Sequence, residues 1–552
     1  MRRLLAPLAL SLTTALGVVA VQGQAKPVPV APTGPPRLIV AISVDQFSGD
    51  LYAQYRPTYR YGLARLGQGA VFPAGFQSHA ATETCPGHST LLTGTRPARN
   101  GIIANTWFEP DGPRKTKPIY CAEDERDPAS SPRNPVVSAF HLKVPTLGEY
   151  MKAANPASRN VAVSAKDRAV MMMGGHQIDA GYWWKGAGFV TLNGRQLSPA
   201  AVRVNANVTT LLGKGAKPFV LPANCTAANR PIPVGKGFAG NGAFALPPNK
   251  PDLFRTSPRM DAATVDLATA LVDEMNLGKG AAPDVLSVSL SATDYIGHAT
   301  GTEGSEMCIQ MAQLDWQIGR LLDHLDKKGI DYMVVLSSDH GGLDMPERLD
   351  QQAYPRAARV DTSLSPEVLS KAAGVKSGVV LLDGPLVVAD GGDYYVNRAV
   401  PADQRKRVVD ALLTIVRANP QVAAAYSSEE LAKTPLPAGS PQDWTIKERA
   451  RASFDPARSG DVVILLERGI TPIPEPMPGA YIATHGSVWD YDRRVPMLFW
   501  RRGMRSFEQP HPVETVDIAP TLVAILGLRV PDGAFDGRCL DLDGGEGNTC
   551  GS

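Results

Sequence analysis

The sequence predicts an α/β fold built on a doubly wound, mainly parallel sheet. Four short apolar runs, each followed by polar residues, are typical of strands buried on both faces of a parallel sheet. Amphipathic helical segments alternate with these runs along the 552 residues, which is the pattern of a wound α/β protein. A content of 43% hydrophobic and 20% charged residues excludes a collagenous, low-complexity or disordered chain and suits one large globular unit or two to three packed ones.

The predicted strands occupy residues 37–44, 284–290, 332–336 and 495–500. Asp45, Asp294 and Asp339 follow the first three of them. In such sheets ligands bind just beyond the carboxyl ends of the strands, so we expect these acids to line a binding edge. The clearest helix spans residues 305–328, where leucines and methionines recur at helical spacing, and we interpret those methionines as core residues.

Two long segments interrupt the alternation, and we predict that they are insertions capping the carboxyl edge of the sheet. Residues 170–255 are rich in Gly and Pro and show no clear helical period. Residues 355–480 contain apolar strands and a helix over 404–417, which predicts a small inserted α/β subdomain. The core of the protein then consists of residues 36–169, 256–354 and 481–552.

The first 25 residues have the features of a secretory signal peptide. Arg2 and Arg3 form a short basic region, residues 4–21 are mostly apolar, and residues 23–25 have the small-x-small pattern of a cleavage site. The alternative is an uncleaved membrane anchor, but the apolar stretch is at the short end of a spanning length and a Pro-rich segment follows it. We therefore expect a periplasmic or secreted protein without a membrane anchor. Cleavage would leave 54 basic and 54 acidic residues, so no nucleic-acid-binding surface is expected.

Six cysteines suit an oxidising compartment, where an even number permits complete pairing. None has the C-x-x-C spacing of a zinc ribbon or a thioredoxin-like site. Cys539 and Cys550 bracket a short loop rich in Gly and Asp, and we predict that they form a disulfide. The sequence leaves the pairing of the other four open.

Carboxylates and histidines gather where the predicted strands end. Asp294 and His298 are four residues apart, close enough to bind one ion, and Asp339 precedes His340 where the chain turns into two glycines. The full set of candidate metal ligands is Asp45, Asp294, His298, Asp339, His340 and His485.

Nitrogen and oxygen donors without thiolate suit zinc or a similar first-row ion, cobalt and manganese included. A single Asp-x-x-x-His pattern is more often structural, and an Asp-His pair before two glycines also serves to cap a turn. Three carboxylates and three histidines that follow predicted strands instead predict a site for two ions.

Residues 78–108 contain the predicted nucleophile, Thr84. Pro86 suits the first turn of a helix, so a helix is expected to begin near Cys85 with Thr84 at its N-terminus. Free backbone donors and the helix dipole at that position stabilise an alkoxide and an incoming anion, and a metal ion would lower the pKa of the hydroxyl further. The alternative is that Thr84 only caps the helix. Cys85 has no neighbouring base in the sequence, so we interpret it as structural.

Lys166 and Arg168 follow the apolar run 160–165. Residues two apart on a strand share a face, so both cations are expected to point into one pocket while Asp167 points away. Two converging cations repel each other unless an anion or acidic groups lie between them, so the pair predicts an anion site. The alternative is the solvated end of a surface strand.

Together these motifs resemble the alkaline phosphatase superfamily, and most closely the phosphate-irrepressible, Sphingomonas-type alkaline phosphatases with a threonine nucleophile. They occur in the family's order between residues 37 and 500. The matching motifs are VDQ with Asp45, TETCPGH with Thr84, GIIANTWF with Asn105, SAKDR with Lys166 and Arg168, SATDYIGH with Asp294 and His298, SSDHGG with Asp339 and His340, and ATHGS with His485.

The resemblance implies the alkaline phosphatase fold and two zinc ions per chain. One zinc ion would be held by Asp294, His298 and His485. The second would be held by Asp45, Asp339 and His340, with the Thr84 oxygen beside it. Asn105, Lys166 and Arg168 would contact the phosphoryl oxygens.

The implied activity is hydrolysis of small-molecule phosphate monoesters, over a broad substrate range, through a phosphothreonine intermediate. One alternative is a nucleotide pyrophosphatase/phosphodiesterase of the same superfamily, which would be expected to lack the Lys-x-Arg pair. Another is a non-catalytic exported binding protein that kept the fold. A sulfatase is excluded because the residues from Cys85 to His88 do not fit its CxPxR motif. The sequence does not give the oligomeric state, and a monomer is favoured.

Overall fold

The structure is a computed structural model that describes residues 34–551, apart from residues 113, 115, 116, 132, 133, 241 and 480. The predicted signal peptide, residues 1–25, lies outside the described residues. Within the described range, no helix has both the length and the apolar character needed to cross a membrane.

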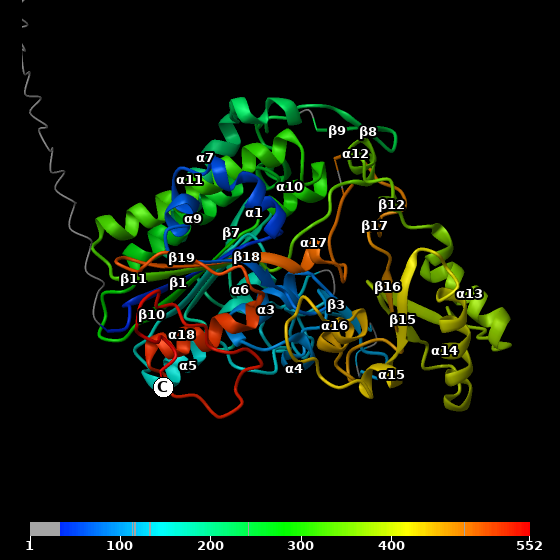
Figure 1. Cartoon of the computed structure of the whole chain (residues 1–552). Helices are drawn as coiled ribbons and strands as arrows, with labels where there is room; N and C mark the ends of the chain where they lie inside the picture. The colour runs from blue at the N-terminus through cyan, green and yellow to red at the C-terminus, as the bar shows by residue number, and fades with distance from the viewer. Residues whose placement is uncertain are drawn as a thin grey trace, which may run out of the picture.

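A ten-stranded sheet forms the centre of the molecule (Figure 1). Its central strands β11, β1, β10, β5 and β6 are parallel neighbours in that order. This confirms the α/β prediction of a mainly parallel sheet. Across the sheet the strands are β19 (Phe507–Glu508), β2 (Ala70–Phe76), β18 (Arg494–Arg501), β11 (Tyr332–Ser337), β1 (Leu38–Val44), β10 (Asp284–Leu290), β5 (Asn160–Ser164), β6 (Ala180–Lys185) and β7 (Gly188–Thr191), with β20 (Val513–Glu514) paired to β2.

Alternate residues of the central strands face two separate hydrophobic cores. In β1, Leu38, Val40 and Ile42 belong to one core, whereas Ile39 and Ala41 belong to the other. Helices cover both faces, one set above and one below the sheet in Figure 1. The first set is α1 (Gly49–Tyr55), α2 (Gly62–Leu66), α7 (Pro199–Lys214), α9 (Arg259–Glu274), α10 (Ala292–Thr300) and α11 (Ser305–Lys327); the second is α3 (Thr84–Thr93), α5 (Leu147–Ala154), α6 (Asp167–Gly174) and α18 (Ile518–Leu526).

The predicted strands and the long helix agree with β1, β10, β11 and α11 to within one residue at each end. The predicted strand 495–500 is β18, but it runs antiparallel to both β11 and β2. The chain enters β18 from α17 (Asp490–Arg493), which is hydrogen-bonded to Gly341 just beyond the carboxyl end of β11. A strand entered from that edge must run the opposite way, and an apolar run carries no information about direction.

Part of the segment 170–255 belongs to the sheet, contrary to the prediction that it only caps the edge. β6 pairs with β5 and β7 pairs with β6, so this hairpin extends the sheet at one side. α7 then packs into the same core as α9. Two short strands joined by Gly186 resemble an irregular Gly-rich loop in the sequence, which explains why they were not predicted. The Cys225–Cys308 disulfide ties a later part of the segment to α11.

The predicted inserted segment 355–480 contains a second, four-stranded antiparallel sheet, which stands beside the main body in Figure 1. Its order is β13 (Val387–Asp390), β14 (Asp393–Val396), β16 (Val462–Leu466) and β15 (Val422–Ser427). α13 (Pro366–Ser377) and α14 (Ala402–Val416) share a hydrophobic core with these strands. α15 (Ser428–Ala432) and α16 (Ile446–Ser453) pack in a smaller cluster that also includes Ala80 of the core. We refer to this unit as the small subdomain.

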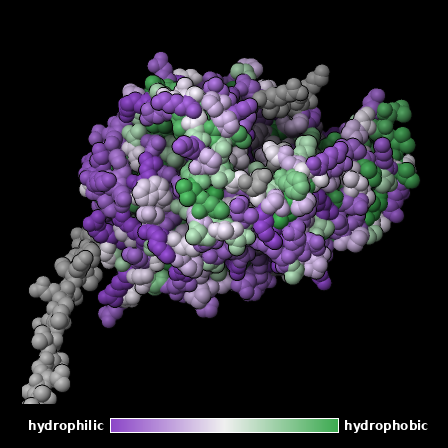
Figure 2. Space-filling model, turned by 90° about the horizontal axis from the view of Figure 1, so that it is seen from above, coloured by the Kyte–Doolittle hydropathy of each residue, from purple (hydrophilic) through white to green (hydrophobic). Residues whose placement is uncertain are grey.

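Figure 2 shows a largely hydrophilic surface with hydrophobic side chains gathered at the outer end of the small subdomain. Val375, Val380 and Leu382 are exposed there by 87%, 80% and 92%. These residues lie in α13 and in the loop after it, on the side away from the main sheet.

Disulfides join all six cysteines. The predicted Cys539–Cys550 disulfide is confirmed. Cys85 is bonded to Cys121, which confirms that it is structural rather than nucleophilic.

The long disulfide loop should stabilise the fold more than the short one, because a cross-link removes more unfolded-state entropy when it closes a longer loop. The half-cystines are separated by 83 residues in Cys225–Cys308 and by 11 in Cys539–Cys550. We expect the Cys225→Ala/Cys308→Ala variant to lose about 4.5 kcal/mol and the Cys539→Ala/Cys550→Ala variant about 3 kcal/mol. Urea unfolding of both variants measures the difference. A larger loss in the short-loop variant would contradict this prediction.

Candidate active site

The carboxyl ends of four neighbouring parallel strands bring predicted site residues together. Asp45 directly follows β1, and Asp339 lies two residues beyond Ser337, the last residue of β11. Asp294 lies in the first turn of α10, which follows β10, and Lys166 lies just after β5. Because β5, β10, β1 and β11 are adjacent and parallel, these residues meet at one edge of the sheet.

α3 carries Thr84 at its first position. Thr84 is completely buried, and Glu83 occupies the cap position without a side-chain capping bond, so Thr84 is not the cap. The helix approaches the end of β11 very closely, because a Cβ atom on Gly87 would lie 1.9 Å from the carbonyl oxygen of Asp339. Only a residue without a Cβ permits that approach. Gly87 therefore allows the helix to hold Thr84 beside the candidate metal ligands.

Two histidines direct Nε2 at one oxygen of Asp294. Nε2 of His298 lies 3.2 Å from Oδ1 of Asp294, and Nε2 of His485 lies 3.3 Å from the same atom. His298 comes from α10, whereas His485 follows the small subdomain in the chain. The fold thus brings together ligand candidates that are far apart in the sequence.

The second group surrounds His340. Its Nε2 lies 3.3 Å from Oδ2 of Asp339 and 3.5 Å from Oδ1 of Asp45. Its ring stacks on that of His485 with 3.6 Å between centroids, so the two groups are contiguous. The ligand atoms of Asp45, Asp339 and His340 lie within 4.8 Å of one another, and so do those of Asp294, His340 and His485. By distance His340 therefore belongs to both groups, and His298 joins the first through Asp294.

Backbone carbonyls hold these three imidazole rings in place. Nδ1 of His298 lies 2.8 Å from the oxygen of Ala483, Nδ1 of His485 2.8 Å from that of Thr82, and Nδ1 of His340 2.9 Å from that of Gly341. A carbonyl oxygen can only accept, so each Nδ1 carries the proton and donates it. Each Nε2 is then left with its lone pair facing the carboxylates, as metal binding requires.

The donors fit divalent metal ions. Buried atoms without a hydrogen-bond partner face one another here, namely Oδ1 of Asp45, Oδ1 of Asp294, Oδ2 of Asp339 and Nε2 of His340. Buried polar atoms are normally satisfied, so this concentration of unpartnered lone pairs indicates a site for cations. Carboxylate oxygens with imidazole nitrogens are a donor set that zinc favours.

Lys166 and Arg168 converge on the Thr84 hydroxyl. Nζ of Lys166 lies 3.2 Å from Oγ1 of Thr84, and Nη2 of Arg168 lies 3.4 Å from it. The prediction that both residues lie on a strand is wrong, because β5 ends at Ser164 and α6 begins at Asp167. Lys166 is the cap of that helix and Arg168 lies in its first turn. The chain turn, rather than strand alternation, directs both cations to one point.

Lys166 also contacts one carboxylate from each of the two groups of candidate metal ligands. Its Nζ lies 2.5 Å from Oδ2 of Asp294 and 2.7 Å from Oδ2 of Asp45. Burial disfavours its charge, but Asp294 and Asp45 outweigh that effect and raise the pKa of Lys166 above its ordinary value. Burial raises the pKa of Asp45 well above its ordinary value, and the charge of Asp339 adds to this rise. Burial acts on Asp294 too, yet Lys166 and His298 hold its pKa well below the ordinary value.

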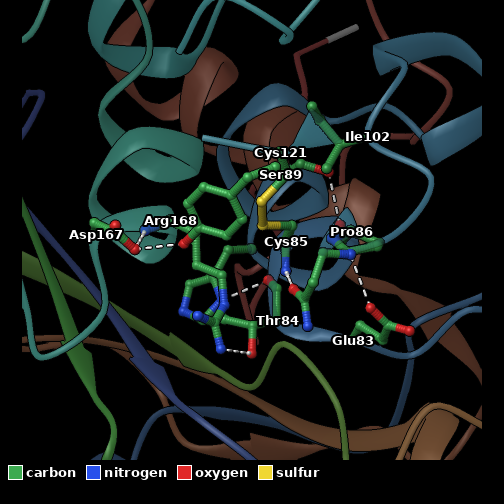
Figure 3. Close-up of a disulfide and its surroundings, with 12 residues drawn as sticks. Glu83, Thr84, Cys85, Pro86, Ser89, Ile102, Cys121, Asp167 and Arg168 are labelled. Carbon is green, nitrogen blue, oxygen red and sulfur yellow. Dashed lines mark hydrogen bonds between the residues drawn. A yellow bond between two sulfur atoms is a disulfide. The ribbon is translucent and has the colours of Figure 1, made fainter. Parts of the chain in front are cut away.

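Asn105 is fixed beside Thr84 through two hydrogen bonds. The backbone N–H of Cys85 donates to its Oδ1 at 2.9 Å, and its own N–H donates to Oε2 of Glu83 at 2.8 Å. Its side-chain NH2 group is thereby left to donate to a ligand. Figure 3 shows the Cys85–Cys121 disulfide next to Thr84, with Asp167 and Arg168 beside it.

Three residues near the site were not predicted. Nδ1 of His88 lies 3.0 Å from Oδ2 of Asp339 and 2.9 Å from the oxygen of Thr84. Glu83 holds Asn105, and the Tyr120 hydroxyl donates to Oδ1 of Asp167 at 2.5 Å, next to Arg168. His88 had a sequence signal, since it follows Thr84 by one helical turn within TETCPGH. Glu83 and Tyr120 act through tertiary contacts that no local pattern indicates.

Comparison with known proteins gives consistent matches over nearly the whole chain. A family profile described as type I phosphodiesterase / nucleotide pyrophosphatase matches residues 39–488. The chain is 50% identical to alkaline phosphatase PhoK of Sphingomonas sp., over 94% of this chain and 93% of the relative. It is 47% identical to alkaline phosphatase PhoD of Zymomonas mobilis subsp. mobilis, over 93% of this chain and 89% of the relative. The crystal structure of wild-type alkaline phosphatase PafA matches with a TM-score of 0.80 at 26% identity, covering 92% of this chain and 99% of that one.

Replacing His88 should weaken metal binding. His88→Ala removes the imidazole nitrogen that lies 3.0 Å from Oδ2 of Asp339. Loss of such an outer contact to a metal ligand typically lowers metal affinity about 10- to 100-fold. Competition with a chromogenic chelator measures zinc affinity, and circular dichroism checks that the variant is folded. His511→Ala is the matched control, because His511 is exposed and lies away from the site. Equal zinc affinities in the two variants would contradict the assigned role of His88.

Proposed function

Because the chain belongs to the type I phosphodiesterase/nucleotide pyrophosphatase family of the alkaline phosphatase superfamily, we propose that it is an exported, zinc-dependent alkaline phosphatase. It hydrolyses a broad range of small phosphate monoesters through a phosphothreonine intermediate. Relatives named alkaline phosphatase are identical at about half of the positions over nearly the whole chain, which supports its assignment as a phosphoric monoester hydrolase.

The convergence of Lys166 and Arg168 on Thr84 is the observation that carries the proposal. A phosphate monoester presents a transferable group with two negative charges, whereas a diester presents one. The buried Lys166 and the half-buried Arg168 lie within 3.4 Å of the nucleophile oxygen and match the larger charge. Lys offers a point charge and Arg offers paired donors to two phosphoryl oxygens.

Each of these residues then has a separate role in the reaction. Thr84 lies at the positive end of the α3 dipole and attacks phosphorus as the bond to the ester oxygen breaks. Lys166 and Arg168 hold the phosphoryl oxygens during attack, and the NH2 group of Asn105 adds a neutral donor. Water then attacks the phosphothreonine, which releases phosphate and restores the Thr84 hydroxyl.

The metal ligands belong to two sites in this proposal. Asp294, His298 and His485 would hold the first zinc ion, and a second would be held by Asp45, Asp339 and His340. Bound zinc supplies Lewis acidity, which lowers the pKa of a nearby hydroxyl or water and stabilises negative charge on the entering and leaving oxygens. The buried unpartnered oxygens of the three carboxylates support this assignment.

The family description keeps phosphodiester hydrolysis as the second candidate. The metal ligands and Thr84 would serve either reaction, so they do not distinguish the two. The measurement that does is kcat/KM for an aryl phosphate monoester and for the matching diester, each before and after chelation. A preference for the diester would overturn the phosphatase assignment, and full activity after chelation would overturn the metal requirement.

Lys166→Ala should reduce monoester hydrolysis more than diester hydrolysis. We expect kcat/KM to fall about 100- to 1000-fold for the monoester and about tenfold for the diester, because the monoester loses the larger charge interaction. Lys371→Ala, which removes an exposed lysine of α13, serves as the control. Equal losses for both substrates would contradict a role in dianion recognition.

Thr84→Ala should abolish the covalent intermediate. Rapid quenching with labelled substrate should trap phosphoprotein in the native enzyme and none in the variant. Ser89→Ala is the matched control, since Ser89 lies in the same helix and its hydroxyl donates to the oxygen of Pro86 at 2.7 Å. Phosphoprotein in Thr84→Ala that disappears only when Ser89 is also removed would reassign the nucleophile.

A further inference from the structure

A large cavity lies between the carboxyl edge of the main sheet and the small subdomain. Its volume is about 590 Å³, which is within the usual range for small-molecule pockets. Tyr481, His485 and Tyr491 line it from the core, and Leu364, Tyr394 and Ile464 line it from the small subdomain.

One wall of the cavity is shared with the first candidate metal site. His485, which faces Asp294 through Nε2, lines the cavity directly. Tyr481 also lines it and packs edge-on against the ring of His298, with 4.3 Å between centroids. Tyr481 remains 57% exposed although it touches a buried histidine. The cavity therefore begins at the first candidate metal site.

The lining is mostly apolar, and the basic side chain among its described residues is His485 of the first candidate metal site. Apolar atoms provide most of its surface, and no Lys or Arg is among the described residues that line it. Its carboxyl side chains are Glu83, Asp361 and Asp492. Aromatic groups pack well against tyrosine faces, whereas a second anionic group would meet carboxylates, hydroxyl groups and apolar surface but no Lys or Arg of the described lining.

We propose that this cavity binds the alcohol part of the phosphate ester and gives the enzyme a preference for bulky, uncharged aryl alcohols over alcohols that carry a second negative charge. This inference rests on the proposed phosphatase function, in which Asp294, His298 and His485 would hold the zinc ion that stabilises charge on the leaving oxygen. The phosphoryl group stays at Thr84, Lys166 and Arg168. The group attached to its ester oxygen extends past His485 and Tyr481 into the cavity.

The test compares three substrates: phenyl phosphate, 2-naphthyl phosphate and 6-sulfo-2-naphthyl phosphate. The two naphthyl esters have similar size and leaving-group reactivity but differ by one negative charge. We expect kcat/KM for 2-naphthyl phosphate to exceed that of its sulfonated analogue at least tenfold. Equal values for the two would overturn the inference.

A variant that adds a positive charge to the cavity tests whether the substrate preference arises there. Ala389 of β13 lines the cavity, so Ala389→Lys adds a cation to it. We expect the ratio of the two naphthyl esters to fall about tenfold in this variant, while kcat/KM for phenyl phosphate changes less than about threefold. Ala402→Lys is the matched control, because Ala402 is exposed at the start of α14 and does not line the cavity. An unchanged ratio in Ala389→Lys, or an equal change in Ala402→Lys, would overturn the inference.

Phenyl phosphate separates this inference from the function on which it rests. A native enzyme that does not hydrolyse phenyl phosphate would overturn the proposed function and the inference with it. A native enzyme that hydrolyses phenyl phosphate but does not discriminate between the naphthyl esters would overturn the inference alone.

Discussion

Three buried carboxylates at the ends of three neighbouring parallel strands repel one another, and most of the site is arranged around that repulsion. Asp45, Asp294 and Asp339 are each at most 2% exposed, so water does little to screen their charges. The pKa values of Asp45 and Asp294 shift in opposite directions. Burial makes Asp45 harder to ionise, whereas Lys166 keeps Asp294 ionised. Cations are needed for all three carboxylates to be charged together. Lys166 is one such cation within the chain, and the unpartnered oxygens leave room for metal ions to supply the rest.

Contacts of a different kind position Thr84, the proposed nucleophile. Gly87 brings α3 against the backbone of Asp339, and His88 joins the same helix to the Asp339 carboxylate. The disulfide of Cys85 connects the start of this helix to Cys121, whose neighbour Tyr120 contacts the start of α6. Thr84 and the two cations near it are therefore held by one connected set of contacts. Side chains that are held in place in this way can stabilise the charge that develops during a reaction without first rearranging.

Much of the main sheet and its acidic edge could be predicted from the sequence. Strands buried on both faces read as continuous apolar runs, and the residues after them must meet at one edge when the strands are parallel, as Asp45, Asp294 and Asp339 do. The direction of β18, the β6–β7 hairpin and the helical position of Arg168 could not be predicted, because each depends on where the chain enters a strand or where a short strand ends. Glu83 and the cavity lining could not be predicted either. Glu83 acts through a hydrogen bond to Asn105, 22 residues away, and the cavity is lined by segments hundreds of residues apart. Physical proximity across such separations leaves no local pattern.

The order of the site residues along the chain determines when the candidate ligands can assemble during synthesis. Asp45 follows the first strand of the sheet, whereas His485 comes after the small subdomain and shortly before β18. No N-terminal fragment that stops before His485 contains all the candidate ligands, so synthesis must be nearly complete before they can assemble.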